Sequence, residues 1–562
     1  MALPALIPHP VSDLSPEDLR RTLEQFVPAG LSRKKRIDAI RALLETPQGK
    51  MMRAEMGRWI VEHLVPIASL VPEEYAAWRP PVRDAMLYVV AHLSPARLAP
   101  KLLEQLELPS GARPEKRLLC LIARVPGLQK LGQVLARNRH LRPALRRSLS
   151  QLENGIRDVD APGTRAIIRR QLGSKLERLG VQMDSRLLSE ASVSAIVRFT
   201  WRNPESGQKE RGVFKVLKPH IPDCFAEDME LLHDLSQYFA QHHHEYGARA
   251  RLIPDTFRKV RRLLQHEVDF VREQTTLVEA GKLYHDIAGV RIPRVLAPLC
   301  TPTITALSEE RGAKVTAAAA RMPQWRRRQV GEQLVAALVA VPLFASGESS
   351  LFHGDPHAGN LLYDAPARDL IIVDWALRER LSRQQRRQLA LLFLMVALRD
   401  PVGASTAIAA LAERPVRRGS RQWEIIRNHT AHYIDQVPLT QFPSAVDAMR
   451  VLEKAAYEGI RFPGSLIMLS KVLFTLDGIL HDIGCSSASM GTAMARHMAR
   501  RWLTARAGFA SPLTAGDWVT VQCSAILYSS RLWVKGQQTI VDRFLPGGAR
   551  DEKIVSAASP RR

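Results

Sequence analysis

The chain has 562 residues, of which 46% are hydrophobic and 24% are charged, so it is long enough for several folding units and too apolar for extensive disorder. Its 80 lysines and arginines outnumber its 56 aspartates and glutamates, and the formal net charge of +24 predicts attraction to nucleotide phosphates or to an anionic membrane. Aromatic residues make up only 6% of the chain, which disfavours a nucleic-acid partner, because single strands stack on aromatic side chains.

The cysteines and the N-terminal sequence indicate the compartment. The five cysteines are scattered without a CxxC pair, which argues against a disulfide framework and a cysteine-based zinc site. The opening MALPALIPHPVSDL lacks the basic segment of a secretory signal. The longest apolar stretches, residues 333–344 and 389–398, fall short of the roughly 20 residues that span a bilayer. We therefore expect a cytoplasmic protein, with peripheral attachment to the inner face of the membrane.

The first half of the chain passes from helices to strands. Residues 1–125 predict helices separated by proline-containing breaks, and SPEDLRRTLEQF near the start has a capping-box pattern. From about residue 185, SVSAIVRFTW, the turn RNPESGQKERG and VFKVLK predict an antiparallel hairpin. Helical sequence resumes at 223–285, and VRIPRVLAPLCTPTITALSEERG then predicts two more strands.

The second half begins with a helix over 324–345, which leads into the polar stretch LFHGDPHAGNLLYD at 351–364. NLLYD and LIIVDW predict a second hairpin, and residues 380–540 read as helical before a frayed tail. A small β-rich lobe followed by a mostly helical lobe is the order of a protein-kinase-like fold. We therefore predict a two-lobed α+β protein, helical overall, whose domains are 1–125, 126–310, 311–510 and 511–562, the last a helical segment with a flexible tail.

The polar stretch has the residue types that phosphoryl transfer requires. The reaction needs a lysine that grips phosphates, a carboxylate near the attacking hydroxyl and hard oxygen ligands for Mg²⁺. Asp355 and Asn360 have the spacing of the kinase catalytic loop HRDxxxxN, and Asp374 ends the following apolar strand. Lys215 lies at an alternating position of the strand VFKVLK, with Lys218 as a rival three residues later. The stretch therefore predicts a catalytic loop.

At these residues the sequence resembles the UbiB/ADCK family of atypical kinases, whose loop is HxDPHxGN, over roughly residues 126–400. Further resemblance lies in QKLGQ, similar to the family's KxGQ extension, and in SEASVSAIV, similar to its Ala-rich loop over the nucleotide. FKVLKPHI resembles its lysine strand, and HEVDFVREQ resembles its ExD motif with the following helix glutamate. The resemblance implies a kinase fold with an added helical segment that shields the site.

The resemblance also implies roles for individual residues, with ATP and Mg²⁺ as cofactors. Lys215 would contact the nucleotide phosphates and pair with Glu273, and Asp355 would take the catalytic-loop position. Asn360 and Asp374 would bind Mg²⁺.

The resemblance implies that residues of the KxGQ, ExD and Ala-rich segments contact the nucleotide or shield the site. Lys130 and Gln133 would fold over the active site near Glu267 and Asp269. The remaining nucleotide contacts would come from the Ala-rich loop, at Ala191 and Ser192. If Glu267 and Glu273 lie on one helix, their side chains point about 120° apart and can contact different neighbours.

The chain departs from the family pattern in three places. DFG is replaced by DWA at 374–376, EAxN is replaced by EQTT at 273–276, and Ser189 and Glu190 stand where alanines are expected. An acidic residue beside phosphates is unfavourable unless it points away. These departures predict a lowered nucleotide affinity.

Three functions remain open. The first is a UbiB-like kinase or ATPase linked to isoprenoid quinone (ubiquinone) biosynthesis or prenyl-lipid handling at a membrane surface. The second is a small-molecule phosphotransferase of the aminoglycoside or choline kinase type, which shares HGDxHxxN but lacks the KxGQ segment and favours an acidic cleft. The third is a pseudokinase that binds nucleotide as an assembly module, which the DWA sequence favours and the retained Asp355, Asn360 and Asp374 disfavour.

Overall fold

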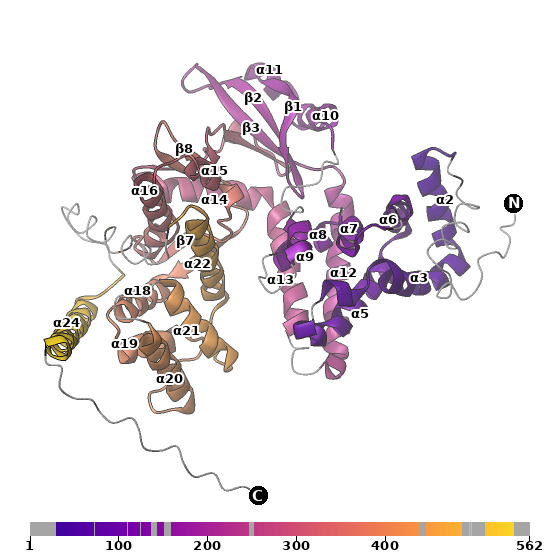
Figure 1. The fold of residues 1–562 in the computed structure, drawn as a ribbon. Helices are drawn as coiled ribbons and strands as arrows, with labels where there is room; N and C mark the ends of the chain where they lie inside the picture. Colours follow the sequence, from indigo (N-terminus) through magenta and orange to yellow (C-terminus); the bar gives the residue numbers. More distant parts are fainter. Residues whose placement is uncertain are drawn as a thin grey trace, which may run out of the picture. The chain divides into compact units, whose positions relative to one another are not determined.

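The computed structural model (Figure 1) describes the chain in segments and divides it into two compact units. The first unit is Met1–Val278 with Pro293–Glu309, and the second is Glu279–Ile292 with Glu310–Arg562. The helix predicted for SPEDLRRTLEQF and the predicted tail beyond 544 lie outside the described residues. The described residues are 30–71, 73–109, 111–123, 125–136, 143–150, 159–246, 252–437, 445–485 and 512–544, with 28, 494 and 496.

Helices form most of the first unit. Several begin with a proline in their first turn, where the missing N–H costs nothing, so the predicted proline breaks are helix starts. The helices are α2 (Arg33–Glu45), α3 (Pro47–Trp59), the π-helical turn η2 (Ile60–Leu64), α4 (Ile67–Leu70), the 3-10 turn η3 (Glu73–Trp78), α5 (Arg79–His92), α6 (Pro95–Glu107), α7 (Pro114–Ile122), α8 (Pro126–Ala136), α9 (Pro143–Ser150), α12 (Ile221–Gln241) and α13 (Leu252–Val268).

One hydrophobic core joins the N-terminal helices to α12 and α13. Leu98 and Leu103 of α6 belong to the same buried cluster as Leu235 and Phe239 of α12 and Val260 of α13. The predicted boundary at residue 125 therefore does not separate two cores.

The sheet of the first unit has the order β1-β2-β3-β5, and all its neighbouring strands are antiparallel. The predicted hairpin is confirmed as β2 (Ser194–Arg202) and β3 (Lys209–Leu217), and Ile304–Ser308 forms β5. Strand β1 (Gln182–Glu190) was not predicted, because it is a largely exposed edge strand without apolar alternation. Two helices, α10 (Ala161–Leu172) and α11 (Ser174–Arg178), lie beside the sheet (Figure 1). Their buried apolar side chains belong to the same core cluster as those of the sheet.

The helical stretch that contains the predicted ExD motif is broken. Helix α13 ends at Val268 and α14 (Phe270–Tyr284) begins after Asp269. The backbone N–H of Arg272 donates to Asp269 Oδ1 at 2.9 Å, as in an N-cap. The prediction that Glu267 and Glu273 share one helix is therefore wrong.

Strands of the second unit surround the polar stretch. The predicted second hairpin is confirmed as β8 (Leu361–Asp364) and β9 (Asp369–Ile372), in a sheet of order β4-β9-β8-β6 with β4 (Val290–Arg291) and β6 (Ala313–Lys314). A two-stranded sheet pairs β7 (Ser349–His353) antiparallel with β10 (Arg378–Ser382).

Helices make up the rest of the second unit. The predicted helix over 324–345 contains a π-helical turn, η7 (Ala336–Ala340), just before Pro342. Proline cannot donate to the preceding turn, which explains the local widening. The helices are α15 (Val315–Ala319), α16 (Gln324–Val335), α17 (Val341–Leu343), the 3-10 turn η8 (Ala358–Asn360), α18 (Arg383–Ala397), α19 (Pro401–Leu411), α20 (Arg421–Gln436), α21 (Ala445–Tyr457), α22 (Gly464–Asp482) and α24 (Ala515–Phe544).

Helix α22 is long and apolar enough to cross a membrane by length and composition, which the sequence analysis did not foresee. Leu466, Leu473 and Leu476 of α22 are fully buried in the protein, and Lys471 in its middle forms an ion pair with Asp355. These contacts identify α22 as a core helix of the second unit.

Candidate functional site

In the first unit, Lys215 and Glu273 form the ion pair that the family resemblance predicts. Lys215 lies on β3 opposite Ile196 of β2 and Thr305 of β5, and its Nζ donates to Glu273 Oε1 at 2.7 Å. The Glu273 side chain is 2% exposed, and the Lys215 ammonium lies 5.4 Å from the centroid of the Phe270 ring. The strand register and α14 therefore hold a partly buried lysine, paired with a buried carboxylate, in a defined position.

Lys218, the rival lysine, has a different partner. Its Nζ lies 3.3 Å from Glu190 Oε2, and both side chains are buried. Glu190 ends β1, and the short turn that follows contains Ala191 and Ser192, closed by a hydrogen bond from the Ala191 N–H to the Ser194 carbonyl. The predicted Ala-rich loop is therefore a tight strand-to-strand turn, and the acidic side chain that departs from the family pattern pairs with a lysine.

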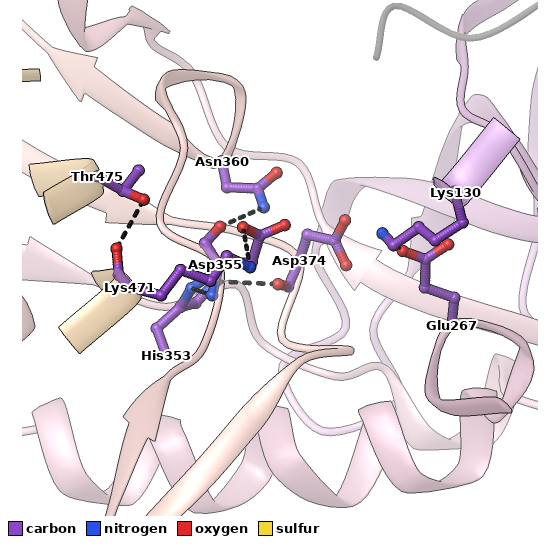
Figure 2. Close-up of polar contacts among 8 residues, drawn as sticks. All are labelled: Lys130, Glu267, His353, Asp355, Asn360, Asp374, Lys471 and Thr475. Atoms are coloured by element: carbon purple, nitrogen blue, oxygen red, sulfur yellow. Dashed lines mark hydrogen bonds and ion pairs between the residues drawn. The ribbon is translucent and has the colours of Figure 1, made fainter. Parts of the chain in front are cut away.

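Lys130 of α8 contacts Glu267 near the end of α13, as the resemblance predicts (Figure 2). The Lys130 residue is only 7% exposed, so the pair is well shielded from water. The start of α8 is fixed by buried Asp228, whose Oδ2 accepts from the Gly127 N–H at 2.7 Å. Gln133 also lies on α8, but its side chain is outside the described part of the structure.

In the second unit, the catalytic-loop candidates are held by one hydrogen-bond network (Figure 2). The side-chain amide of Asn360 donates to the Asp355 carbonyl at 3.1 Å. His353 Nε2 lies 2.9 Å from the Asp374 carbonyl, while its Nδ1 accepts from the Asp355 N–H at 3.2 Å. His353 therefore links the backbones of Asp355 and Asp374, and this geometry assigns the proton to Nε2. Burial lowers the pKa of His353, although nearby Asp355 opposes the shift.

The DWA sequence is compatible with this geometry. Trp375 is fully buried, its Nε1 donates to the Ile372 carbonyl at 3.1 Å, and its ring meets the His353 ring edge-on. Asp374 has a left-handed backbone conformation, with φ 59°, whereas Ala376 does not. Since only a left-handed position favours glycine, alanine at 376 fits the observed conformation.

The sequence analysis missed Lys471. This residue of α22 donates to Asp355 Oδ1 at 3.2 Å. It lies 116 residues from Asp355 in the sequence, inside an apolar helix without a motif, so no local pattern signals it.

The donor chemistry fits Mg²⁺ delivered with a nucleotide. Asp374 offers a carboxylate, and Asn360 offers a side-chain carbonyl, since its amide nitrogen is the atom that bonds to Asp355. Mg²⁺ needs only one or two protein oxygens when phosphates complete its shell. Within the described ranges no group of three or more His, Cys, Asp or Glu could hold a metal ion.

Comparison with known proteins identifies the domain that contains Lys215, Glu273, Asp355, Asn360 and Asp374. Residues 151–407 match the family model of the ABC1 atypical kinase-like domain. This match agrees with the resemblance of the chain to the UbiB/ADCK family. The predicted fold class, a mostly helical α+β kinase-like fold, is thereby confirmed.

The individual proteins to which the chain is similar are distant. Uncharacterized protein sll1770 of Synechocystis sp. is 25% identical over 367 residues, which cover 64% of this chain and 60% of that protein. A probable protein kinase UbiB of Aeromonas salmonicida is 24% identical over 424 residues, covering 74% of this chain and 72% of its own. A solved complex of Rv3197 with erythromycin from Mycobacterium tuberculosis overlaps 65% of this chain and 89% of its own, with 17% identity and a TM-score of 0.43.

Proposed function

We propose that this protein binds Mg-ATP and acts as an atypical kinase or ATPase of the UbiB/ADCK type. The observation that supports this most strongly is the network in which His353 and Asn360 hold Asp355 and Asp374. A loop fixed through its backbone hydrogen bonds holds two carboxylates in defined positions, as a site for a cation and a reacting hydroxyl requires. The Lys215–Glu273 pair adds a positioned lysine that can bind phosphates.

In this proposal each residue keeps the role that the family resemblance implies. Lys215 binds nucleotide phosphates and is oriented by Glu273, and Asn360 and Asp374 hold Mg²⁺, which neutralises phosphate charge. Asp355 orients the attacking hydroxyl or water. Ala191 and Ser192, at the β1–β2 turn, approach the nucleotide through their backbones. Lys130, Gln133, Glu267 and Asp269 shield the site.

We further propose action at an anionic membrane surface, in isoprenoid quinone biosynthesis or prenyl-lipid handling. The net charge of +24 favours attraction to anionic lipid. Helix α24 has exposed apolar side chains at intervals of seven and eight residues, which places them on one helix face. They are Val519, Ile526, Leu527, Trp533 and Val534. Such a face suits shallow insertion between lipid headgroups.

The test is the Mg²⁺-dependent ATPase rate with anionic liposomes, with neutral liposomes and without lipid. We expect turnover in the wild type, a higher rate on anionic liposomes, and loss of turnover in Asp355→Asn and Asp374→Asn. Ile526→Ser with Trp533→Ser is expected to remove the stimulation and retain the basal rate. Nucleotide binding without turnover would indicate that the protein is a nucleotide-binding module and not an enzyme.

A further inference from the structure

The catalytic-loop candidate lacks a cation of its own. Residues 353–360, HGDPHAGN, contain no lysine or arginine. His353 Nδ1 accepts from the Asp355 N–H, and His357 Nδ1 accepts from the Gly359 N–H at 3.1 Å. Each of these two ring nitrogens is therefore occupied by a backbone hydrogen bond within the loop. A cationic side chain beside the transferred phosphate, in addition to Mg²⁺ and Lys215, would therefore come from outside this loop.

Lys471 brings an ammonium to this loop. Its Nζ lies 3.2 Å from Asp355 Oδ1, and its side chain is 34% exposed whereas that of Asp355 is 9% exposed. Figure 2 shows Lys471 extending from α22 toward Asp355. The side chain therefore reaches from a partly solvated position to the carboxylate that would lie beside the transferred phosphate.

The backbone of Lys471 is held in place by the core of the second unit. Ser470 and Val472, its neighbours on α22, are buried, and the Ser470 hydroxyl donates to Glu453 Oε1 of α21 at 3.1 Å. The Lys471 carbonyl accepts from the Thr475 hydroxyl at 2.9 Å. A lysine on a packed helix keeps its charge near one spot, which is the requirement for a preorganised phosphate contact.

We propose that Lys471 binds the γ-phosphate of ATP while it remains beside Asp355. An ammonium has three N–H donors, so it can hold a carboxylate and a phosphate oxygen together. This inference rests on the proposed function, because it assumes that Mg-ATP binds at Asp355, Asn360 and Asp374. It predicts that Lys471 discriminates ATP from ADP, since ADP has no γ-phosphate.

The experiment measures the Mg²⁺-dependent affinities of ADP and of a non-hydrolysable ATP analogue by isothermal titration calorimetry. In Lys471→Met we expect roughly a ten- to hundredfold loss of affinity for the analogue, the usual contribution of a charge-assisted hydrogen bond. ADP affinity is expected to stay at the wild-type level, which also shows that the variant is folded. Lys471→Arg is expected to recover most of the loss, and Lys454→Met, at an exposed lysine of α21, is expected to change neither affinity.

Two results would overturn the inference in distinguishable ways. A Lys471→Met variant with unchanged affinities, or with equal losses for both nucleotides, removes the γ-phosphate role and leaves the proposed function standing. A wild-type protein that binds neither nucleotide removes the proposed function and the role of Lys471 together.

Discussion

The Lys215 ammonium lies 2.7 Å from the carboxylate of Glu273, on a helix that starts more than fifty residues after the lysine strand. Glu273 is almost completely buried, and its backbone N–H donates to the Asp269 carbonyl at the start of α14. The pair therefore depends on strand register and on the helix start together. A lysine fixed in this way can contact phosphates with little further loss of side-chain entropy.

Replacement of Lys215 tests this role. Lys215→Met is expected to weaken Mg-ATP binding about tenfold or more, the loss of a charge-assisted phosphate contact. Equilibrium binding of a fluorescent ATP analogue measures the effect. Lys209→Met, at an exposed lysine of the same strand, is the matched control and should bind normally. Equal affinities in the two variants would contradict the assignment.

Glu190 provides a second prediction, since it pairs with buried Lys218. Glu190→Gln is expected to lower stability by about 1–3 kcal/mol, because it removes a charge partner of a buried ammonium. Differential scanning calorimetry would show this as a lower melting temperature. ATP affinity is not expected to rise. A stable variant with tighter ATP binding would show instead that Glu190 repels phosphates.

The DWA sequence gives a third prediction. Ala376→Gly restores the family's glycine, but Ala376 is not in a left-handed conformation. We therefore expect no gain in nucleotide affinity or turnover, and a stability loss of roughly 0.5–1 kcal/mol from the added freedom of the unfolded chain. Denaturant unfolding and the ATPase assay measure the two effects. A clear increase in turnover would mean that the missing glycine limits activity.

The core of the candidate site could be predicted because its residues lie close in sequence. One loop contains Asp355 and Asn360, and Asp374 follows the next hairpin. Their order and spacing in the sequence were therefore enough to match them to the kinase pattern. Lys215 could be assigned from strand alternation, and the structure shows that Lys218 pairs with Glu190 instead.

Other features had no local signal. Lys471 meets Asp355 only through tertiary packing. The edge strand β1 lacks apolar alternation, and the break at Asp269 rests on one capping residue inside a helical stretch. The roles of the residues in nucleotide binding stay predictions until the measurements are made.

Helix α24 supplies a pH-dependent prediction. Arg387 of α18 bonds to Asp517 of α24 at 2.7 Å and lowers the pKa of that carboxyl from 3.8 to about 2. A lowered carboxyl pKa stabilises the folded state above pH 3.8, and the stabilisation is lost as pH falls toward 2. Asp517→Asn is therefore expected to lower the free energy that holds α24 in its folded position by about 2 kcal/mol at pH 7.

Hydrogen exchange of the α24 amides measures this effect. The wild type should exchange more slowly than Asp517→Asn at pH 7, and the difference should shrink between pH 4 and pH 2. Equal protection at pH 7 would show that the ion pair does not hold α24.

Mg²⁺-dependent ATP binding is the central claim, and the thermal shift of the purified protein tests it most directly. We expect the melting temperature to rise with ATP only when Mg²⁺ is present, and the rise to be lost in Asp374→Asn, which removes a metal ligand. Asparagine also tolerates the left-handed backbone at 374, so the fold should survive. Asp435→Asn, at an exposed carboxylate of α20, should shift like the wild type. A shift without Mg²⁺, an undiminished shift in Asp374→Asn, or no shift in the wild type would contradict the account.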